Sequence, residues 1–183
     1  AEGNETRIMP ITINVCNMTR PNAEGAALQS SDNVETMFHE FGHALHFMLH
    51  DVHYGTTSGV ETDFVELPSQ INEHWATEPE VLKVYAKHYK TGEVIPMELV
   101  QKLEESGKYG QGFATVEYLA ASLVDMDLHT LTEVPADLDV MQFEQQMLEK
   151  RGIPRQILPR YRVTNFSHSM GGGYTAGYYS YLW

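Results

Sequence analysis

The stretch "MFHEFGHALHFMLH", residues 37–50, decides how this part of the chain folds. It contains four histidines, at His39, His43, His46 and His50. In an α-helix with about 3.6 residues per turn, residues at these spacings lie on one side of the helix. The stretch therefore predicts a single helix that carries several imidazoles on one face.

The start of this helix is predicted from the residues that precede the histidines. Asp32 and Glu35 have the spacing of a capping box, and an acidic first turn is favoured by the helix dipole. We expect the helix to begin there and to end near His50.

Residues 39–43 form the pattern H-E-x-x-H, with Glu40 between the two histidines. Two imidazoles one helical turn apart can bind the same zinc ion, and the enclosed glutamate can then act on a water molecule as a base. His46 and His50 add two more pairs at helical spacing, but neither pair encloses a glutamate. We interpret these two histidines as structural, since lone helical histidines usually are.

A catalytic zinc ion needs a third protein ligand and one open position. Glu61, Asp63 and Glu66 all follow within reach of the histidines. We expect Glu66 to be the ligand because it begins the next helix, and we expect Glu73, on the same helical face, to orient a metal-binding histidine. In the alternative interpretation, Glu66 only stabilises the positive end of its helix.

The rest of the sequence predicts a mainly α fold with a small β-sheet. Residues 8–18, "IMPITINVCNM", alternate apolar and polar side chains, which predicts a strand, either in the core or at an edge where a peptide can pair. A second helix is expected to begin at residues 66–68 and to end or kink at Pro79. Further helices are expected at residues 96–106, 112–130 and 138–150, and an aromatic helix after the glycines of "MGGGYTAGYYSYLW".

Composition limits the partners of the chain. Its 183 residues are enough for one domain, and its 12 basic and 25 acidic residues give a formal charge of −13. We therefore expect no nucleic-acid partner and no membrane association. The single cysteine, Cys16, suits a reducing compartment, so a cytoplasmic location is expected. Because the chain starts at Ala1 and ends on an apolar run, we also expect a piece of a longer protein.

Three separated motifs together resemble one known family. "FHEFGHALH", then "SGVETDFVELPSQINEHW", then "GGGYTAGYYSYLW" resemble the thimet oligopeptidase and dipeptidyl carboxypeptidase family of zinc peptidases. The likeness covers nearly the whole chain, and "LPSQINEHWAT" with the triple glycine is most similar to the bacterial dipeptidyl carboxypeptidase branch. The resemblance implies a zincin-like catalytic region, with the H-E-x-x-H helix followed by a glutamate-bearing helix.

The resemblance also implies roles for individual residues. It makes His39, His43 and Glu66 the ligands of one zinc ion, and Glu40 the general base. Four residues match family positions around the substrate: His168, Tyr174 and Tyr181, taken as catalytic, and Tyr178, taken as substrate-binding. Gly172 and Gly173 are also taken as substrate-binding, because glycines let the backbone pass close to a substrate. Without the resemblance, a buried aromatic helix face would be the favoured interpretation of these tyrosines, and the family match reverses this for Tyr174 and Tyr181 more than for Tyr178.

Two functions remain open from the sequence. The first is zinc-dependent hydrolysis of short peptides, as an oligopeptidase or a peptidyl-dipeptidase. The second is a truncated, catalytically incomplete zinc-binding module, because members of the family are several times longer than this chain. Glu40 favours the first function, since a structural zinc site needs no base. The oligomeric state is not predicted.

Overall fold

The computed structural model describes residues 9–183, which form two compact units. One unit contains the described part of Ala1–Glu61 together with Val65–Glu105, and the other contains Thr62–Phe64 and Ser106–Trp183. A single partial catalytic domain over residues 1–183 stays a prediction. In the described residues, no helix combines the length and apolarity needed to cross a membrane.

Helix α1, Ser31–Leu49, is the histidine-rich helix expected from the sequence. Its N-cap is Ser30, whose hydroxyl accepts a hydrogen bond from the Asn33 backbone N–H at 3.2 Å. The cap predicted at Asp32 is therefore wrong: Ser30, two residues earlier, caps the helix, and its side chain satisfies a free amide of the first turn. Asp32 lies inside that turn, where its charge still suits the helix dipole.

Helix α2, Glu66–Glu73, follows α1 across a loop and continues into a 3-10 turn at His74–Ala76. Helix α3, Pro79–Tyr85, then starts with proline in its first turn, which confirms that Pro79 interrupts the helical run. The Tyr85 hydroxyl donates a hydrogen bond to the Ala76 carbonyl and so ties α3 to the preceding turn. Helix α4, Met97–Gly107, follows.

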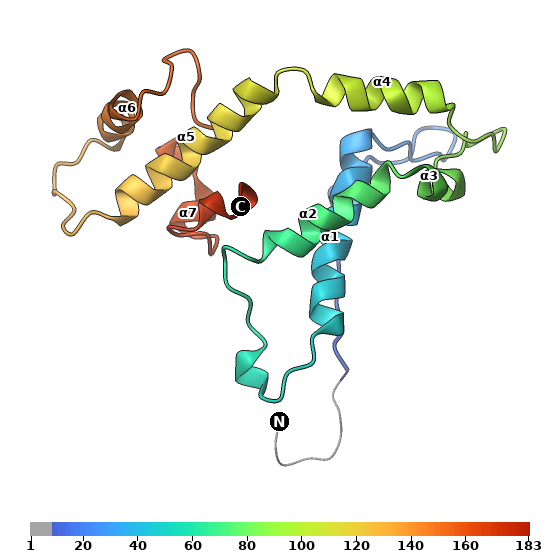
Figure 1. Ribbon diagram of the computed structural model, residues 1–183, viewed down its shortest axis with the longest axis horizontal. Helices are drawn as coiled ribbons and strands as arrows, with labels where there is room; N and C mark the ends of the chain where they lie inside the picture. The colour runs from blue at the N-terminus through green and yellow to red at the C-terminus, as the bar shows by residue number, and fades with distance from the viewer. Residues whose placement is uncertain (1–8) are drawn as a thin grey trace. The chain divides into compact units, whose positions relative to one another are not determined.

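Helices α1 and α2 contact each other closely in the first unit (Figure 1). The closest approach is at Gly42, where an added Cβ would lie 2.6 Å from Ser69 Cα and 2.7 Å from the Pro68 carbonyl oxygen. The Asn72 side-chain amide also donates a hydrogen bond to the Phe38 carbonyl at 2.6 Å. These contacts fix the spacing and register of α1 and α2.

The second unit is built on α5, Gln111–His129, with α6, Val140–Lys150, and the short α7, Ser167–Met170. Its core contains Ala121, Phe166 and Tyr178, with further tyrosines packed against them. In that core the rings of Tyr118 and Tyr178 stack with their centroids 5.0 Å apart. Three helices expected from periodicity are thus confirmed as α4, α5 and α6.

The expected small β-sheet is not found in the described part of the chain. Residues 9–18 form no strand, and Ile8, the first residue of the predicted strand, lies outside the described residues. Ile11, Ile13 and Val15 are 90%, 81% and 89% exposed. An alternating pattern makes a strand only when another strand pairs with it, and between residues 9 and 183 the only β-contact is an isolated bridge from Lys87 to Val94.

The expected aromatic helix is also absent. After the glycines the chain turns, and only Tyr178–Tyr181 forms a short 3-10 turn. Two causes are visible: Ala176 has a left-handed φ of 53°, and the backbone N–H groups of Ala176 and Tyr178 donate to the Asp125 carboxylate. Amide groups bonded to a distant side chain cannot form the ladder of an α-helix.

Candidate metal centre

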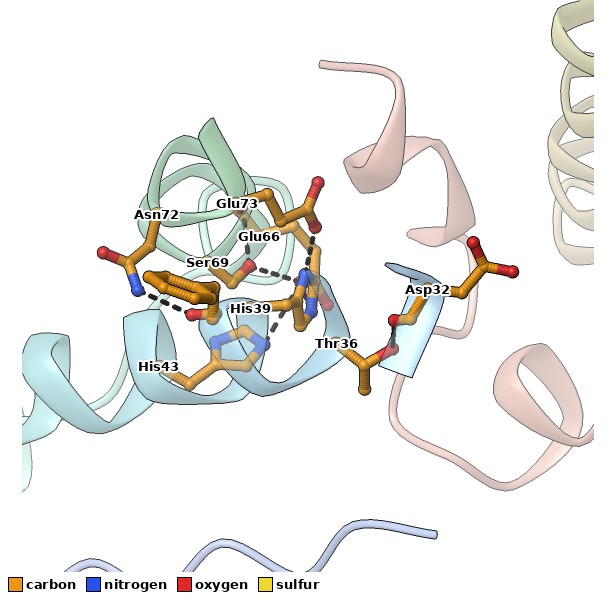
Figure 2. Close-up of polar contacts among 9 residues, drawn as sticks. Asp32, Thr36, His39, His43, Glu66, Ser69, Asn72 and Glu73 are labelled. Carbon is orange, nitrogen blue, oxygen red and sulfur yellow. Dashed lines mark hydrogen bonds and ion pairs between the residues drawn. The ribbon is translucent and has the colours of Figure 1, made fainter. Parts of the chain in front are cut away.

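The side chains of His39, His43 and Glu66 converge on one point between α1 and α2 (Figure 2). Nε2 of His39 and Nε2 of His43 each lie 3.2 Å from Oε2 of Glu66. Ligand atoms bound to a tetrahedral zinc ion at about 2.0–2.1 Å lie roughly 3.3 Å apart, so these separations fit the edges of such a site. The three residues can therefore hold a metal ion with little rearrangement.

Glu66 is held in place before any metal binds. It is 1% exposed, at the first position of α2, and its Oε2 accepts a hydrogen bond from the Ser69 hydroxyl at 2.8 Å. The positive end of the α2 dipole also favours a carboxylate there. Glu66 can thus stabilise the N-terminal end of α2 and also belong to the cluster with His39 and His43, so the two interpretations are not alternatives.

Glu73 fixes the orientation of the His39 ring, as Figure 2 shows. Its Oε1 lies 2.5 Å from Nδ1 of His39, which leaves Nε2 directed at Glu66. This is the carboxylate–histidine arrangement that supports metal-binding histidines in many proteins. Hydrogen bonds to Glu66, the larger cause, and to Glu73 raise the pKa of His39 to about 10. A metal ion bound at Nε2 would thus take the place of a proton.

The remaining candidates around the histidine helix lie outside this cluster. Across residues 9–183, no other group of three or more metal-ligating side chains meets in this way, so neither Glu61 nor Asp63 is the third member. Nδ1 of His50 donates to the Phe47 carbonyl at 2.5 Å, which supports a structural role for this histidine. Glu40 is half-buried on α1, directly after His39.

The aromatic residues predicted to contact substrate form a second cluster, within the second unit. The His168 ring lies 5.8 Å from Tyr174, 5.8 Å from Tyr178 and 6.4 Å from Tyr181, centroid to centroid. Tyr174 and Tyr181 stack at 5.2 Å. Tyr178 is 1% exposed, and burial raises the pKa of its phenol. The structure thus brings all four residues together, with Tyr178 in the core.

Gly172 and Gly173 shape the turn before these tyrosines. An added Cβ at Gly172 would lie 2.9 Å from His168 Cα, so the turn packs directly on the His168 backbone. Gly173 has a φ of 93°, a left-handed conformation that favours glycine. Both glycines are therefore required by the backbone itself.

Sequence reasoning missed two residues that build these clusters. Gly42 lies in the middle of α1, and a glycine inside a strong helical pattern is a signal of close packing. Asp125 is fully buried in α5, and an acidic residue within the apolar run "YLAASLVDMD" is a signal of a buried hydrogen-bond centre.

Comparison with known proteins supports the family resemblance that the three motifs carry. A profile of Peptidase family M3 matches residues 2–183. The chain is 49% identical over 178 residues to a dipeptidyl carboxypeptidase of Escherichia coli (strain K12), covering 95% of this chain and 26% of that protein. It is 37% identical over 178 residues to oligopeptidase A of the same strain, covering 95% of this chain and 26% of that protein. It is 31% identical over 183 residues to saccharolysin of Saccharomyces cerevisiae, covering 97% of this chain and 25% of that protein.

The chain spans about a quarter of the length of these curated relatives. Within that part, the matched region includes both the histidine-rich helix and the tyrosine-rich end. The profile match over residues 2–183 agrees with the family expected from the three motifs, and the chain belongs to peptidase family M3.

Proposed function

We propose that this chain carries the catalytic residues for zinc-dependent hydrolysis of peptide bonds in short peptides. The observation that carries the proposal is the convergence of His39 Nε2 and His43 Nε2 on Glu66 Oε2, each at 3.2 Å. Two neutral imidazoles and one carboxylate are the donor set of a hydrolytic zinc site with an open position. A zinc ion held there would lower the pKa of a water molecule towards neutrality and polarise the scissile carbonyl.

Glu40 is the proposed general base. It accepts a proton from the attacking water and delivers it to the leaving amine, the role of the glutamate in the H-E-x-x-H pattern. Its position next to His39 on α1 and its half-buried side chain support this role. Glu73 keeps the ring of His39 oriented, and Ser69 keeps the carboxylate of Glu66 in place.

His168, Tyr174 and Tyr181 are proposed to donate hydrogen bonds to the substrate and to the developing oxyanion. The proposal rests on their match to the family motif and on their mutual ring contacts. Tyr178 was predicted to bind substrate, but its burial favours a supporting role in the core. Gly172 and Gly173 are proposed to let the backbone pass close to a bound peptide.

The proposed substrates are short peptides from which C-terminal dipeptides are released. The relative with 49% identity is named a dipeptidyl carboxypeptidase, whereas the relatives named oligopeptidase A reach 37%. The formal charge of −13 favours neither nucleic acid nor anionic membranes as partners. A cytoplasmic location stays an expectation.

The test is metal analysis together with cleavage of a quenched short peptide, for the chain and for Glu40→Gln. We expect both proteins to bind one equivalent of zinc. We expect the substitution to lower kcat by roughly a hundredfold or more, because it removes the base. Equal rates in the two proteins would contradict the mechanism.

A second candidate function is a zinc-binding module that is catalytically incomplete. It is favoured by the short coverage, since the chain spans 26% of the Escherichia coli dipeptidyl carboxypeptidase. Zinc binding without cleavage, both in the chain and in Glu40→Gln, would support this candidate. The same measurement therefore separates the two functions.

A further inference from the structure

Asp125 is a buried carboxylate that the proposed mechanism does not use. It lies in α5 and is 0% exposed. Its Oδ1 accepts hydrogen bonds from the Ser169 hydroxyl and, at 3.1 Å, from the Ala176 N–H, while its Oδ2 accepts one from the Tyr178 N–H at 3.1 Å. Nδ1 of His129 lies 3.0 Å from Oδ1. A buried carboxylate is costly without hydrogen-bond donors, and these contacts supply them.

Three of these donors, from Ser169, Ala176 and Tyr178, come from the two ends of one loop. We call residues 170–177 the glycine–tyrosine loop; it contains the three consecutive glycines and Tyr174. Ser169 precedes the loop in α7, Ala176 lies near its end, and Tyr178 follows it. One side chain on α5 therefore binds the entry and the exit of the glycine–tyrosine loop together.

The glycine–tyrosine loop would be loose without this contact. Its three consecutive glycines have the greatest backbone freedom of any residue type. Ala176 has a φ of 53°, a conformation that residues other than glycine rarely adopt. The hydrogen bond from its N–H to Asp125 helps to hold it. A further tie runs from the Thr175 hydroxyl to the Ser169 carbonyl at 2.7 Å. The order of the loop thus depends on contacts around Asp125.

We propose that Asp125 is a positioning residue, which holds the glycine–tyrosine loop so that His168, Tyr174 and Tyr181 keep the arrangement needed to act on substrate. This inference rests on the proposed function. Asp125 acts through the loop backbone, and it contacts no reacting atom. Its role differs from that of Glu73, which orients the His39 ring. That ring belongs to the group of His39, His43 and Glu66, which we call the metal cluster.

The test compares Asp125→Asn with the full, zinc-loaded chain. Asparagine keeps the shape of aspartate but replaces one acceptor oxygen with an NH₂ donor, so at least one loop donor loses its partner. We expect amide hydrogen exchange at Ala176 and Tyr178 to accelerate by roughly tenfold or more. We expect kcat, per folded and zinc-loaded molecule, to fall by a similar factor with KM nearly unchanged, because transition-state contacts are lost.

Asp127→Asn is the matched control. Asp127 lies on the same helix, but its carboxylate binds Arg151 at 2.7 Å. Asp127→Asn removes the same charge, so amide hydrogen exchange at Ala176 and kcat should stay at the values of the unsubstituted chain. Should Asp125→Asn fail to fold, Ser169→Ala removes only the donor before the loop and should show the same two changes at smaller size.

The outcomes separate this inference from the proposed function. Unchanged exchange at Ala176 and Tyr178 in a folded Asp125→Asn protein would overturn the inference, and so would faster exchange with unchanged kcat. If the unsubstituted chain cleaves no peptide, the proposed function fails, and the catalytic consequence of Asp125 fails with it. The exchange comparison still decides whether Asp125 orders the loop.

Discussion

The two histidines of the metal cluster differ in what fixes their rings. His39 uses both nitrogens: Nε2 lies 3.2 Å from Glu66, and Nδ1 lies 2.5 Å from Glu73. His43 contacts Glu66 through Nε2, also at 3.2 Å. Because Glu73 holds Nδ1, the ring of His39 has one orientation and one nitrogen for a metal ion. At the residue scale, helical spacing predicts the pair His39 and His43, whereas Glu66 is expected only because it begins the next helix.

Glu73→Gln is therefore expected to weaken zinc binding without removing a ligand. Glutamine keeps the length of the side chain, but it lacks the charge that supports the ring. We expect zinc affinity to fall by about 10–100-fold, measured by competition with a chromophoric chelator. His46→Ala, on the same helix but outside the cluster, should keep the full affinity. A loss confined to His46→Ala would show that the ligands are assigned wrongly.

At the element scale, the metal cluster depends on the close contact of α1 with α2. Gly42 makes that contact possible, because the backbone of Ser69 and Pro68 occupies the space that a Cβ would need. The Asn72 side chain then bonds to the Phe38 carbonyl and sets the register. The periodicity of one helix does not reveal which residue of the next helix lies opposite, so the sequence could not place this contact.

Gly42→Ala is expected to force α1 and α2 apart. Alanine raises helix propensity, which by itself would stabilise by up to about 1 kcal/mol. The clash with backbone atoms outweighs this gain, so we expect the free energy of unfolding to fall by about 1–3 kcal/mol, with weaker zinc binding. Denaturant titration and chelator competition measure the two effects.

Gly112→Ala is the control for Gly42→Ala. Gly112 is also helical, in α5, but nothing lies within 4 Å of an added Cβ. We expect this substitution to leave the free energy of unfolding unchanged or slightly higher. Similar losses at both positions would mean that the contact between α1 and α2 is not the cause.

At the scale of the whole molecule, the chain keeps its two clusters in separate units. The metal cluster lies within the first unit, and the aromatic cluster and Asp125 lie within the second. Each cluster has its own support: the α1–α2 contact in one, and the α5 carboxylate in the other. A substitution in the metal cluster should therefore change the metal content, whereas a substitution at Asp125 should change amide hydrogen exchange in the second unit.

The aromatic core of the second unit predicts a loss of stability at alkaline pH. Burial is the main cause that raises the pKa of Tyr118 and of Tyr178 above the ordinary value of 10.0. Below pH 10 these phenols are neutral in the folded and the unfolded chain. Above it the unfolded chain loses protons that the folded core retains, so the free energy of unfolding should fall as pH rises.

Denaturant unfolding measured between about pH 9 and 12, with tyrosinate absorbance recorded in parallel, checks this expectation. Tyr118→Phe keeps the ring but removes one buried phenol, so its stability should depend less steeply on pH over this range. A stability that rises with pH would contradict the burial of these groups.

The sequence by itself determined helices α1, α4, α5 and α6, the start of α2 near Glu66, the pair of histidines on α1 and the break at Pro79. Caps, proline and helical periodicity act between residues a few positions apart, so neighbouring residues carry that information. Only the tertiary structure decided that residues 9–18 form no strand and that the tyrosine-rich end is no α-helix. Those outcomes depend on partners far along the chain, as when Asp125 accepts the amide of Tyr178, 53 residues away. Such contacts exist only once the chain has folded.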